Sequence, residues 1–339
     1  METLLILAHV EENGSLGRPA LEALAAAEAL GQALGAKPVV GLVGADPGAA
    51  AESIGSYGAA RWLAAAGPEF AQPRYATDAQ AAGALAKAAG ATVVLAPATS
   101  RWSRSLAGAA QRAGGRADTH ITALNVENGK LLATRWFYRQ RIEATLTRAA
   151  RPWFLTLEPG CWTPWSGAAA PVVLETVAVE AASRTQVLGK KAPQAGEQTI
   201  RPDAELLFVA GAGWTKKQPD GRVRLEEAAE LILSFVRLTQ CSLGSSKSLV
   251  DLSSEGETVL PFLTHMNQVG QTGSTPRHPK GLATCCHGEE PHTVGWRFIQ
   301  QRRAVNLDPN CGWARGKADV LYVADAFEVM AKVNQLLSK

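Results

Sequence analysis

The chain has 339 residues, enough for two domains, and 46% of them are hydrophobic while 19% are charged. This balance excludes an intrinsically disordered chain, which would be poorer in apolar residues. The 34 Lys and Arg residues exceed the 31 Asp and Glu residues only slightly, giving a formal net charge of +3. That excess is too small to make nucleic acid the main partner.

The N-terminal sequence and the spacing of the cysteines bear on the cellular compartment of the protein. The apolar run 4–8 is too short for a signal peptide and leads into Glu11 and Glu12. No stretch reaches the roughly 18 apolar residues of a membrane span. The five cysteines include no CxxC pair, which favours a reducing compartment over a disulfide framework. We therefore expect a cytoplasmic protein with no membrane span.

Apolar runs alternate with alanine-rich segments in the first half of the chain. The expected strands are 4–9, 39–43, 61–64 and 92–96, and the expected helices are 19–34, 49–53 and 78–89. Pro19 lies in the first turn of the first helix and Gly35 lies near its end, as is typical of helix boundaries. Because the strands are apolar throughout, this alternation predicts a parallel sheet covered on both faces.

Short strands follow one another closely between residues 119 and 157. They are expected at 119–126, 131–138, 142–146 and 153–157. The pair Asn128-Gly129 is typical of a tight hairpin turn between the first two. We expect these strands to form an antiparallel extension of the same sheet.

A second α/β domain is predicted after a linker. Residues 189–202 are rich in Lys, Gln, Pro and Gly and lack apolar periodicity, so we place the linker there, between domains 1–188 and 203–339. In the second domain the expected strands are 206–210, 304–306 and 320–323, and the expected helices are 225–238 and 326–337. The predicted fold class is therefore α/β with two domains.

A glycine pair at 211–213 follows one of these strands and invites comparison with a dinucleotide-binding loop. Lys216 stands where the third glycine of GxGxxG would lie, and Trp214 would crowd a pyrophosphate. A tight turn is the more ordinary interpretation. An NAD-dependent oxidoreductase that uses this turn is an alternative function.

Two other glycine-containing segments could touch a ligand. In 244–248 backbone N–H groups, hydroxyls and Lys247 suit an anionic group, although a solvated helix N-cap explains the segment more simply. In 269–274 two glycines bracket Gln271 and Thr272, so that the backbone can approach a planar ligand. The residues alone favour a turn and a ligand loop equally there.

Metal and hydrolase chemistry are both disfavoured by spacing. The run 285–287 with His292 has metal-type residues, but adjacent cysteines seldom chelate one ion and no second pair with zinc spacing follows. Asp118, His120 and a nearby serine could suggest a triad, but no GxSxG elbow holds a nucleophile. We expect no metal and no catalytic residues.

Taken in chain order, the C-terminal motifs resemble the alpha subunit of the electron-transfer flavoproteins. Residues 269–273 match the family's Val-Gly-Gln-Thr-Gly segment without change. Residues 244–251 stand in place of its Gly-Ala-Ser-Arg-x-x-Val-Asp segment, and residues 304–309 in place of Ala-Ile-Asn-Lys-Asp-Pro. Its Ile-Ser-Gly-Ala-Ile-Gln-His segment is matched only at Gly288 and His292.

The resemblance extends over essentially the whole chain. Residues 324–329 correspond to the family's Gly-Asp-Leu-Phe-x-Val ending, and residues 95–99 to a strand-end signature of its N-terminal half. It implies a C-terminal flavodoxin/Rossmann-like domain that binds FAD, and an N-terminal domain that pairs with a beta-type subunit. The cofactor-binding residues that it implies are Ser246, Lys247, Gly270, Gln271, Thr272, Gly273, Gly288, His292, Asn306 and Asp325.

The resemblance also implies a role for several of these side chains. Lys247 takes the place of an arginine beside the isoalloxazine, and Thr272 matches a hydroxyl near flavin N5. His292 matches a histidine at the pyrimidine carbonyl. Asn306 and Asp325 match residues at the adenosine end.

The chain also departs from the family pattern. The family's Gly-Gly-Arg-Gly turn is Gly211-Ala212-Gly213-Trp214, so one arginine of the FAD site is absent. Lysine at 247 gives a point charge where arginine would give a planar fork. These departures indicate a divergent branch of the family.

The function expected from the resemblance is that of an electron carrier rather than an enzyme. The alpha-type subunit would bind FAD and relay electrons one at a time from a dehydrogenase to a quinone oxidoreductase or another redox acceptor. A scaffold subunit of a larger dehydrogenase complex, with weakened flavin function, is the other alternative beside the NAD-dependent enzyme.

Overall fold

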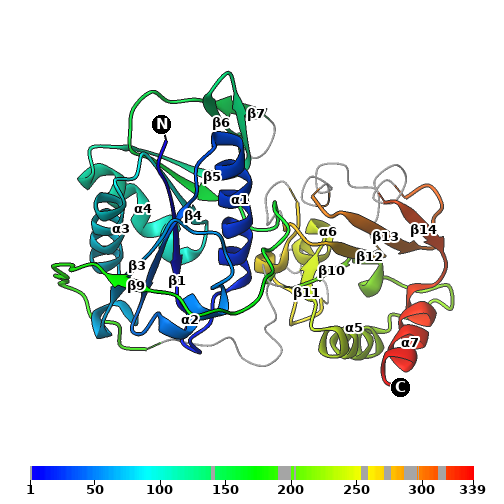
Figure 1. The fold of residues 1–339 in the computed structure, drawn as a ribbon. Coiled ribbons are helices and arrows are strands. Elements are labelled where there is room, and N and C mark those ends of the chain that lie inside the picture. Colours follow the sequence, from blue (N-terminus) through cyan, green and yellow to red (C-terminus); the bar gives the residue numbers. More distant parts are fainter. Residues whose placement is uncertain are drawn as a thin grey trace. The chain divides into compact units, whose positions relative to one another are not determined.

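The computed structural model describes residues 2–138, 142–189, 200–201, 204–252, 259–270, 276–285, 296, 298–311 and 318–339. The chain divides into two compact units, Met1–Lys190 and Lys191–Lys339 (Figure 1). Most of the predicted linker 189–202 lies outside the described residues. Both units are mixed α/β, so the predicted fold class is confirmed.

The first unit is built on a nine-stranded sheet with the order β7-β6-β5-β8-β4-β1-β2-β3-β9. Its strands are β1 (Leu4–His9), β2 (Val39–Gly44), β3 (Arg61–Ala66), β4 (Val93–Pro97), β5 (Arg116–Glu127), β6 (Lys130–Phe137), β7 (Ile142–Leu146), β8 (Trp153–Leu157) and β9 (Leu174–Thr176). The four predicted strands β1 to β4 are confirmed, and they pair in parallel. No strand was predicted at β9.

Helices cover both faces of this sheet, as the apolar strands predicted. They are α1 (Arg18–Leu34), α2 (Gly48–Ser53), α3 (Tyr75–Ala89) and α4 (Ser100–Arg112). Leu4 and Ile6 of β1 share a core with α1 and α2, while Leu5 and Leu7 share another with α3 and α4. Successive side chains of a strand point to opposite faces, so β1, which is buried from Leu4 to Ala8, supplies both cores.

The antiparallel extension is smaller than predicted. Among the strands that the structure describes, the ladders β5–β6 and β6–β7 alone are antiparallel. Asn128 and Gly129 adopt φ of 50° and 72° at the turn between β5 and β6, which confirms the predicted hairpin. β8 is the correction, because it lies between β4 and β5 and runs parallel to both.

A long extended segment links β8, near the middle of this sheet, to β9 at its edge. On its way the Trp165 N–H donates to the Leu21 carbonyl and the Ala170 N–H donates to the Glu52 carbonyl, at 3.0 Å each. β9 then pairs in parallel with β3. We call residues 158–173 the strap, since they fasten α1 and α2 along the sheet.

The second unit is built on a five-stranded parallel sheet with the order β11-β10-β12-β13-β14. Its elements are β10 (Leu206–Ala210), α5 (Leu225–Thr239), β11 (Ser242–Ser245), α6 (Lys247–Asp251), β12 (Lys280–Thr284), β13 (Gln301–Asn306), β14 (Val320–Val323) and α7 (Ala326–Leu337). The predicted strands β10, β13 and β14 and helices α5 and α7 are confirmed. β11 and β12 were not predicted.

The strand order places a switch point between β10 and β12. From β10 the chain moves outward to β11, and it then crosses to β12 on the other side of β10. In open α/β sheets ligands bind outside the carboxyl ends of the strands at such a point. Among the described residues, no helix is long and apolar enough to cross a membrane.

Candidate functional site at the carboxyl edge of the second sheet

The carboxyl ends of all five strands of the second unit lie along one edge, because the strands are parallel. The residues that follow or end these strands are Gly211, Ser246, Cys285, Asn306 and Asp325. Three of them, Ser246, Asn306 and Asp325, were predicted from the sequence as site residues. The edge that general topology marks for ligands therefore holds these predicted residues.

A cavity of about 430 Å³ opens at this edge, and it brings Asn306 and Asp325 together. Asn306 ends β13 and is 4% exposed, and its Oδ1 accepts a hydrogen bond from the Asp308 N–H at 3.0 Å. Asp325 caps α7, where its Oδ1 accepts from the Phe327 N–H at 2.7 Å. An amide and a carboxylate are thus fixed on one wall, a pair suited to ribose hydroxyls.

The loop after β10 is hydrogen-bonded to the carboxyl end of β12 at the switch point. The N–H groups of Gly211 and Gly213 donate to the carbonyls of Thr284 and Cys285, at 2.8 and 3.1 Å. The Trp214 side chain is fully buried, and its Nε1 donates to Thr284 Oγ1 at 2.9 Å. Its ring lies 4.6 Å from that of Phe327, which lines the cavity. Trp214 is therefore packed into the core beside the carboxyl end of β12.

This loop lacks the geometry of a dinucleotide fingerprint. The fingerprint needs a glycine-rich turn that opens directly into a helix pointing its N-terminus at the pyrophosphate. Here a short 3₁₀ helix, Ala212–Thr215, follows β10, and α5 begins only at Leu225. The structure therefore favours the tight-turn interpretation of Gly211–Gly213.

Two lysines missed by sequence reasoning line the same cavity. Lys216 and Lys217 follow the 3₁₀ helix, and Gln218 lines the cavity beside them. The Gln218 Nε2 donates to the carbonyls of Gly213 and Lys216, at 3.0 and 2.8 Å. In the sequence, Lys216 stands out only as the residue that breaks GxGxxG. Two adjacent cations just beyond a strand-end turn were the signal that could have identified them.

Cys285 lines the cavity as a neutral thiol. It has a left-handed backbone, with φ of 55°. Burial, with smaller contributions from the charges of Asp325 and Cys311, raises the pKa of Cys285 to about 12. The thiolate is the nucleophilic form, so this thiol is unsuited to covalent catalysis at neutral pH.

The predicted residues near β11 lie at the same edge but do not line this cavity. Ser246 is 2% exposed and caps α6, its Oγ accepting from the Leu249 N–H at 3.4 Å. Lys247 forms an ion pair with Asp251, and its side chain is 41% exposed. Gly270, with φ of 136°, follows a segment whose Val269 N–H donates to Ser245. The N-cap interpretation is confirmed for Ser246, although this cap is buried rather than solvated.

Several predicted site residues lie outside the described part of the chain. They are Gln271, Thr272, Gly273, Gly288 and His292. Of the candidate metal residues, only Cys285 belongs to the described part.

The considered hydrolase triad does not form. The Asp118 carboxylate accepts from Arg148 Nη2 and from Trp153 Nε1, at 2.8 Å each. His120 instead contacts Glu158, with 2.6 Å between Nδ1 and Oε2. Because Asp118 and His120 have separate partners, no charge relay to a serine is built here.

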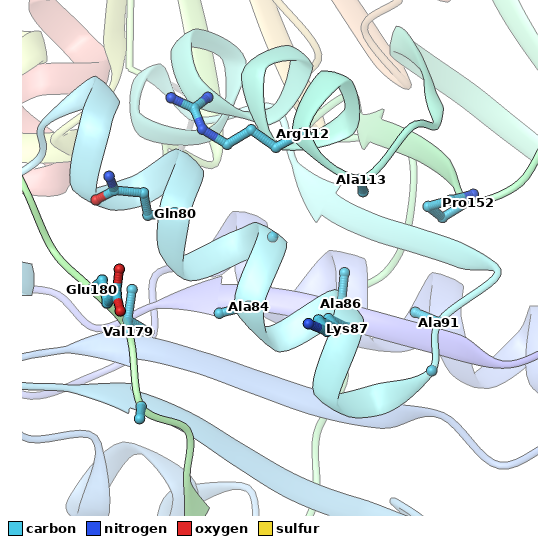
Figure 2. A pocket seen from close by; sticks show the side chains of 13 residues that line it. Gln80, Ala84, Ala86, Lys87, Ala91, Arg112, Ala113, Pro152, Val179 and Glu180 are labelled. Atoms are coloured by element: carbon cyan, nitrogen blue, oxygen red, sulfur yellow. The ribbon is translucent and has the colours of Figure 1, made fainter.

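A second cavity, of about 670 Å³, lies in the first unit (Figure 2). Gln80 and Lys87 of α3, Arg112 of α4 and the segment 178–180 contribute to its walls. Figure 2 shows that small side chains such as Ala84, Ala86 and Ala113 line much of the rest. None of the predicted site residues lines it, and it gives no set of groups arranged for catalysis.

Comparison with known proteins concerns mainly the first unit. The family model described as the electron transfer flavoprotein domain matches residues 4–184. No curated protein matches the chain.

Proposed function

Since the chain belongs to the electron transfer flavoprotein domain family, we propose that it is the alpha-type subunit of such a flavoprotein. In this proposal its C-terminal unit binds FAD and relays electrons one at a time. The observation that carries the proposal is the cavity at the carboxyl edge of the second sheet, on which Asn306 and Asp325 meet. A complete second α/β unit after the matched residues gives the cofactor a place.

The described residues fit a flavin dinucleotide. On the β13–β14 side, Asn306 and Asp325 offer an amide and a carboxylate to the adenosine end. On the β11 side, Ser245 Oγ is buried and has no hydrogen-bond partner among the described residues. Such an orphaned hydroxyl is rare in native proteins unless a ligand or water satisfies it. Polar groups that could bind a ligand therefore lie both on the β11 side and on the β13–β14 side of the sheet edge.

When FAD is bound, its isoalloxazine supplies the redox chemistry, and the chain supplies binding, orientation and charge. Lys247 would place a cation at the flavin end, where Gln271, Thr272 and His292 are also expected from the motifs. Asp251 holds the Lys247 ammonium through the ion pair along α6 and so limits where it can reach. This arrangement requires no general base of the kind that substrate chemistry would need.

The proposed partners follow from the same role. A beta-type subunit would pair with the first unit, a dehydrogenase would donate electrons, and a quinone oxidoreductase or another redox protein would accept them. Five cysteines without paired spacing support work in a reducing compartment such as the cytoplasm.

A scaffold role within a larger dehydrogenase complex is the second candidate. The observation that favours it is the fully buried Trp214, which takes up space beside the end of β12 at the switch point. Gly213 also stands where the family carries an arginine. The orphaned Ser245 hydroxyl and the Asn306–Asp325 pair oppose this candidate, because a site without a ligand has no need of them.

The flavin content of the purified protein distinguishes the flavoprotein subunit from the scaffold subunit. We expect the chain, coexpressed with a beta-type partner under saturating FAD, to carry about one FAD per chain when the released flavin is quantified after denaturation. Only a trace of flavin would contradict the proposal and favour the scaffold. Released NAD in its place would instead support the NAD-dependent enzyme.

A further inference from the structure

We propose that Lys216 and Lys217 form a phosphate clamp at the mouth of the second unit's cavity. The clamp takes the diphosphate of a nucleotide whose ribose reaches Asp325. This inference rests on the proposed function for the identity of the ligand, an adenosine diphosphate moiety. It goes further by assigning to two lysines the charge that holds this moiety.

The balance of charge in the cavity indicates an anionic ligand. Among the described residues, those that line the cavity and carry charge are Lys216, Lys217 and Asp325. Asp325 already accepts the Phe327 and Glu328 N–H groups as the cap of α7, which offsets part of its negative charge. Cys285 stays neutral because its pKa is raised to about 12. Two cations therefore face one partly compensated carboxylate, a distribution that attracts phosphate.

The loop that carries the lysines is held in place by hydrogen bonds of its own. Gln218 binds the carbonyls of Gly213 and Lys216 through its side chain, and its own N–H donates to the Arg222 carbonyl at 2.8 Å. Trp214 anchors the start of the loop in the core. A loop ordered in advance loses less conformational entropy on binding, so its charges contribute more to affinity.

The acidic residue of the same loop is paired elsewhere. Asp220 Oδ2 accepts from Arg224 Nη2 at 2.7 Å. This ion pair removes the nearest loop carboxylate from competition for the lysines. Lys216 and Lys217 are exposed residues that line the cavity, so a phosphate can reach them from solvent.

The position of the clamp follows from Trp214. The Trp214 side chain is buried beside the carboxyl end of β12, where its Nε1 donates to Thr284 Oγ1, so it takes up space at the switch point that a phosphate could otherwise use. Lys216 and Lys217, which follow the 3₁₀ helix, line the same cavity as Asn306 and Asp325. In the proposed complex the lysines hold the diphosphate, while Asn306 and Asp325 meet the sugar.

The test compares ADP with adenosine on the full chain by isothermal titration calorimetry. The double variant Lys216→Ala/Lys217→Ala should bind ADP at least about tenfold more weakly, since a hydrogen bond to a charged group is worth about 1.5–3 kcal/mol. Its affinity for adenosine should stay unchanged, and the salt dependence of ADP binding should become shallower. Lys332→Ala, which removes a lysine of α7 that contacts Gln335, is the matched control and should leave both affinities unchanged.

The outcomes separate the clamp from the proposed function. If the double variant binds ADP as tightly as the wild type does, and likewise FAD, the clamp is overturned and the flavoprotein role stands. If the double variant loses affinity for adenosine by the same factor as for ADP, the clamp is also overturned. The lysines would then affect binding by supporting the structure of the site and not by contacting phosphate. A wild-type chain that takes up neither ADP nor FAD overturns the clamp and the flavoprotein role together.

Discussion

His9, at the end of β1, makes the stability of the first unit depend on pH. Its ring lies 6.2 Å from that of Trp102, and burial lowers its pKa. The charge of Arg101 acts in the same direction, while Glu11 and Asp78 oppose it. The unfolded chain therefore binds a proton more readily at this residue, so its contribution to the free energy of unfolding falls as the pH drops below about 6.5.

When the pH is lowered from about 7.5 to about 5.5, the free energy of unfolding of His9→Gln, measured in urea, should fall less than that of the wild type. His120→Gln provides a control of opposite sign. The hydrogen bond to Glu158 raises the pKa of His120, so this residue stabilises the fold below its unfolded pKa and ceases to do so as the pH rises through its folded pKa. Removing it should make the loss on acidification larger. Identical pH profiles for both variants would contradict the two assignments.

Lys247 should influence a bound flavin only modestly. Its ammonium pairs with Asp251, and its side chain is 41% exposed. An exposed ion-paired charge is worth about 0.2–1 kcal/mol, and about 1.4 kcal/mol corresponds to 59 mV for one electron. Lys247→Met should therefore lower the flavin potential by about 10 to 40 mV in spectroelectrochemical titration. An unchanged midpoint, like that expected of Lys332→Met, would show that Lys247 is not at the flavin.

At the scale of elements, the strap depends on a missing side chain at Gly55, just after α2. A Cβ placed on Gly55 would lie 1.9 Å from the carbonyl oxygen of Ala170 in the strap. Ala170 is itself hydrogen-bonded to Glu52, and the Ser56 N–H donates to the Ala168 carbonyl at 3.2 Å. Gly55→Ala should therefore cost about 1–3 kcal/mol in urea unfolding, because the backbones must move apart.

Gly83→Ala is the matched control for that change. Gly83 lies within α3, and a Cβ there would meet no atom within 4 Å. Alanine should stabilise the helix by about 0.4–1 kcal/mol through the unfolded chain. Equal effects of the two substitutions would show that the strap does not constrain Gly55.

Local pattern predicted the strands that are apolar and missed those that are not. β1 to β4 and β10 carry continuous apolar runs, whereas β11 (Ser242–Ser245) and β12 (Lys280–Thr284) are short and contain Gly, Ser, Thr or Lys. Their places in the sheet are set by neighbours distant in sequence, since strand propensity depends on context. The pairing direction of β8 was predicted wrongly for the same reason, because it too is set by neighbours distant in sequence. Its hydrophobic run indicates a buried strand, but pairing direction depends on which strands it joins.

The site was predictable where motif and topology coincide. Asn306 and Asp325 end or follow strands of a parallel sheet, and parallel strands bring their carboxyl ends to one edge. Lys216 and Lys217 were missed because the preceding glycines drew attention to a fingerprint that does not form. The burial of Trp214 also escaped prediction, since only the packed sheet shows that its side chain turns inward.

At the scale of the molecule, the first unit has what it needs to fold alone. Its sheet carries one apolar core on each face, and the described residues of both cores belong to this unit. We expect a fragment of residues 2–189 to unfold cooperatively in urea, with coincident transitions by tryptophan fluorescence and far-ultraviolet circular dichroism. The fragment should retain no flavin. Separate transitions, or flavin bound to the fragment, would contradict this division.

The late position of β9 has a consequence for synthesis. A ribosome makes β3 well before it makes the strap and β9, so the nascent sheet has an unpaired edge at β3 for much of translation. An open edge strand is a template for pairing with other chains. A pause that delays residues 158–176 prolongs that exposure, so the yield of folded protein should depend on how quickly this stretch is translated.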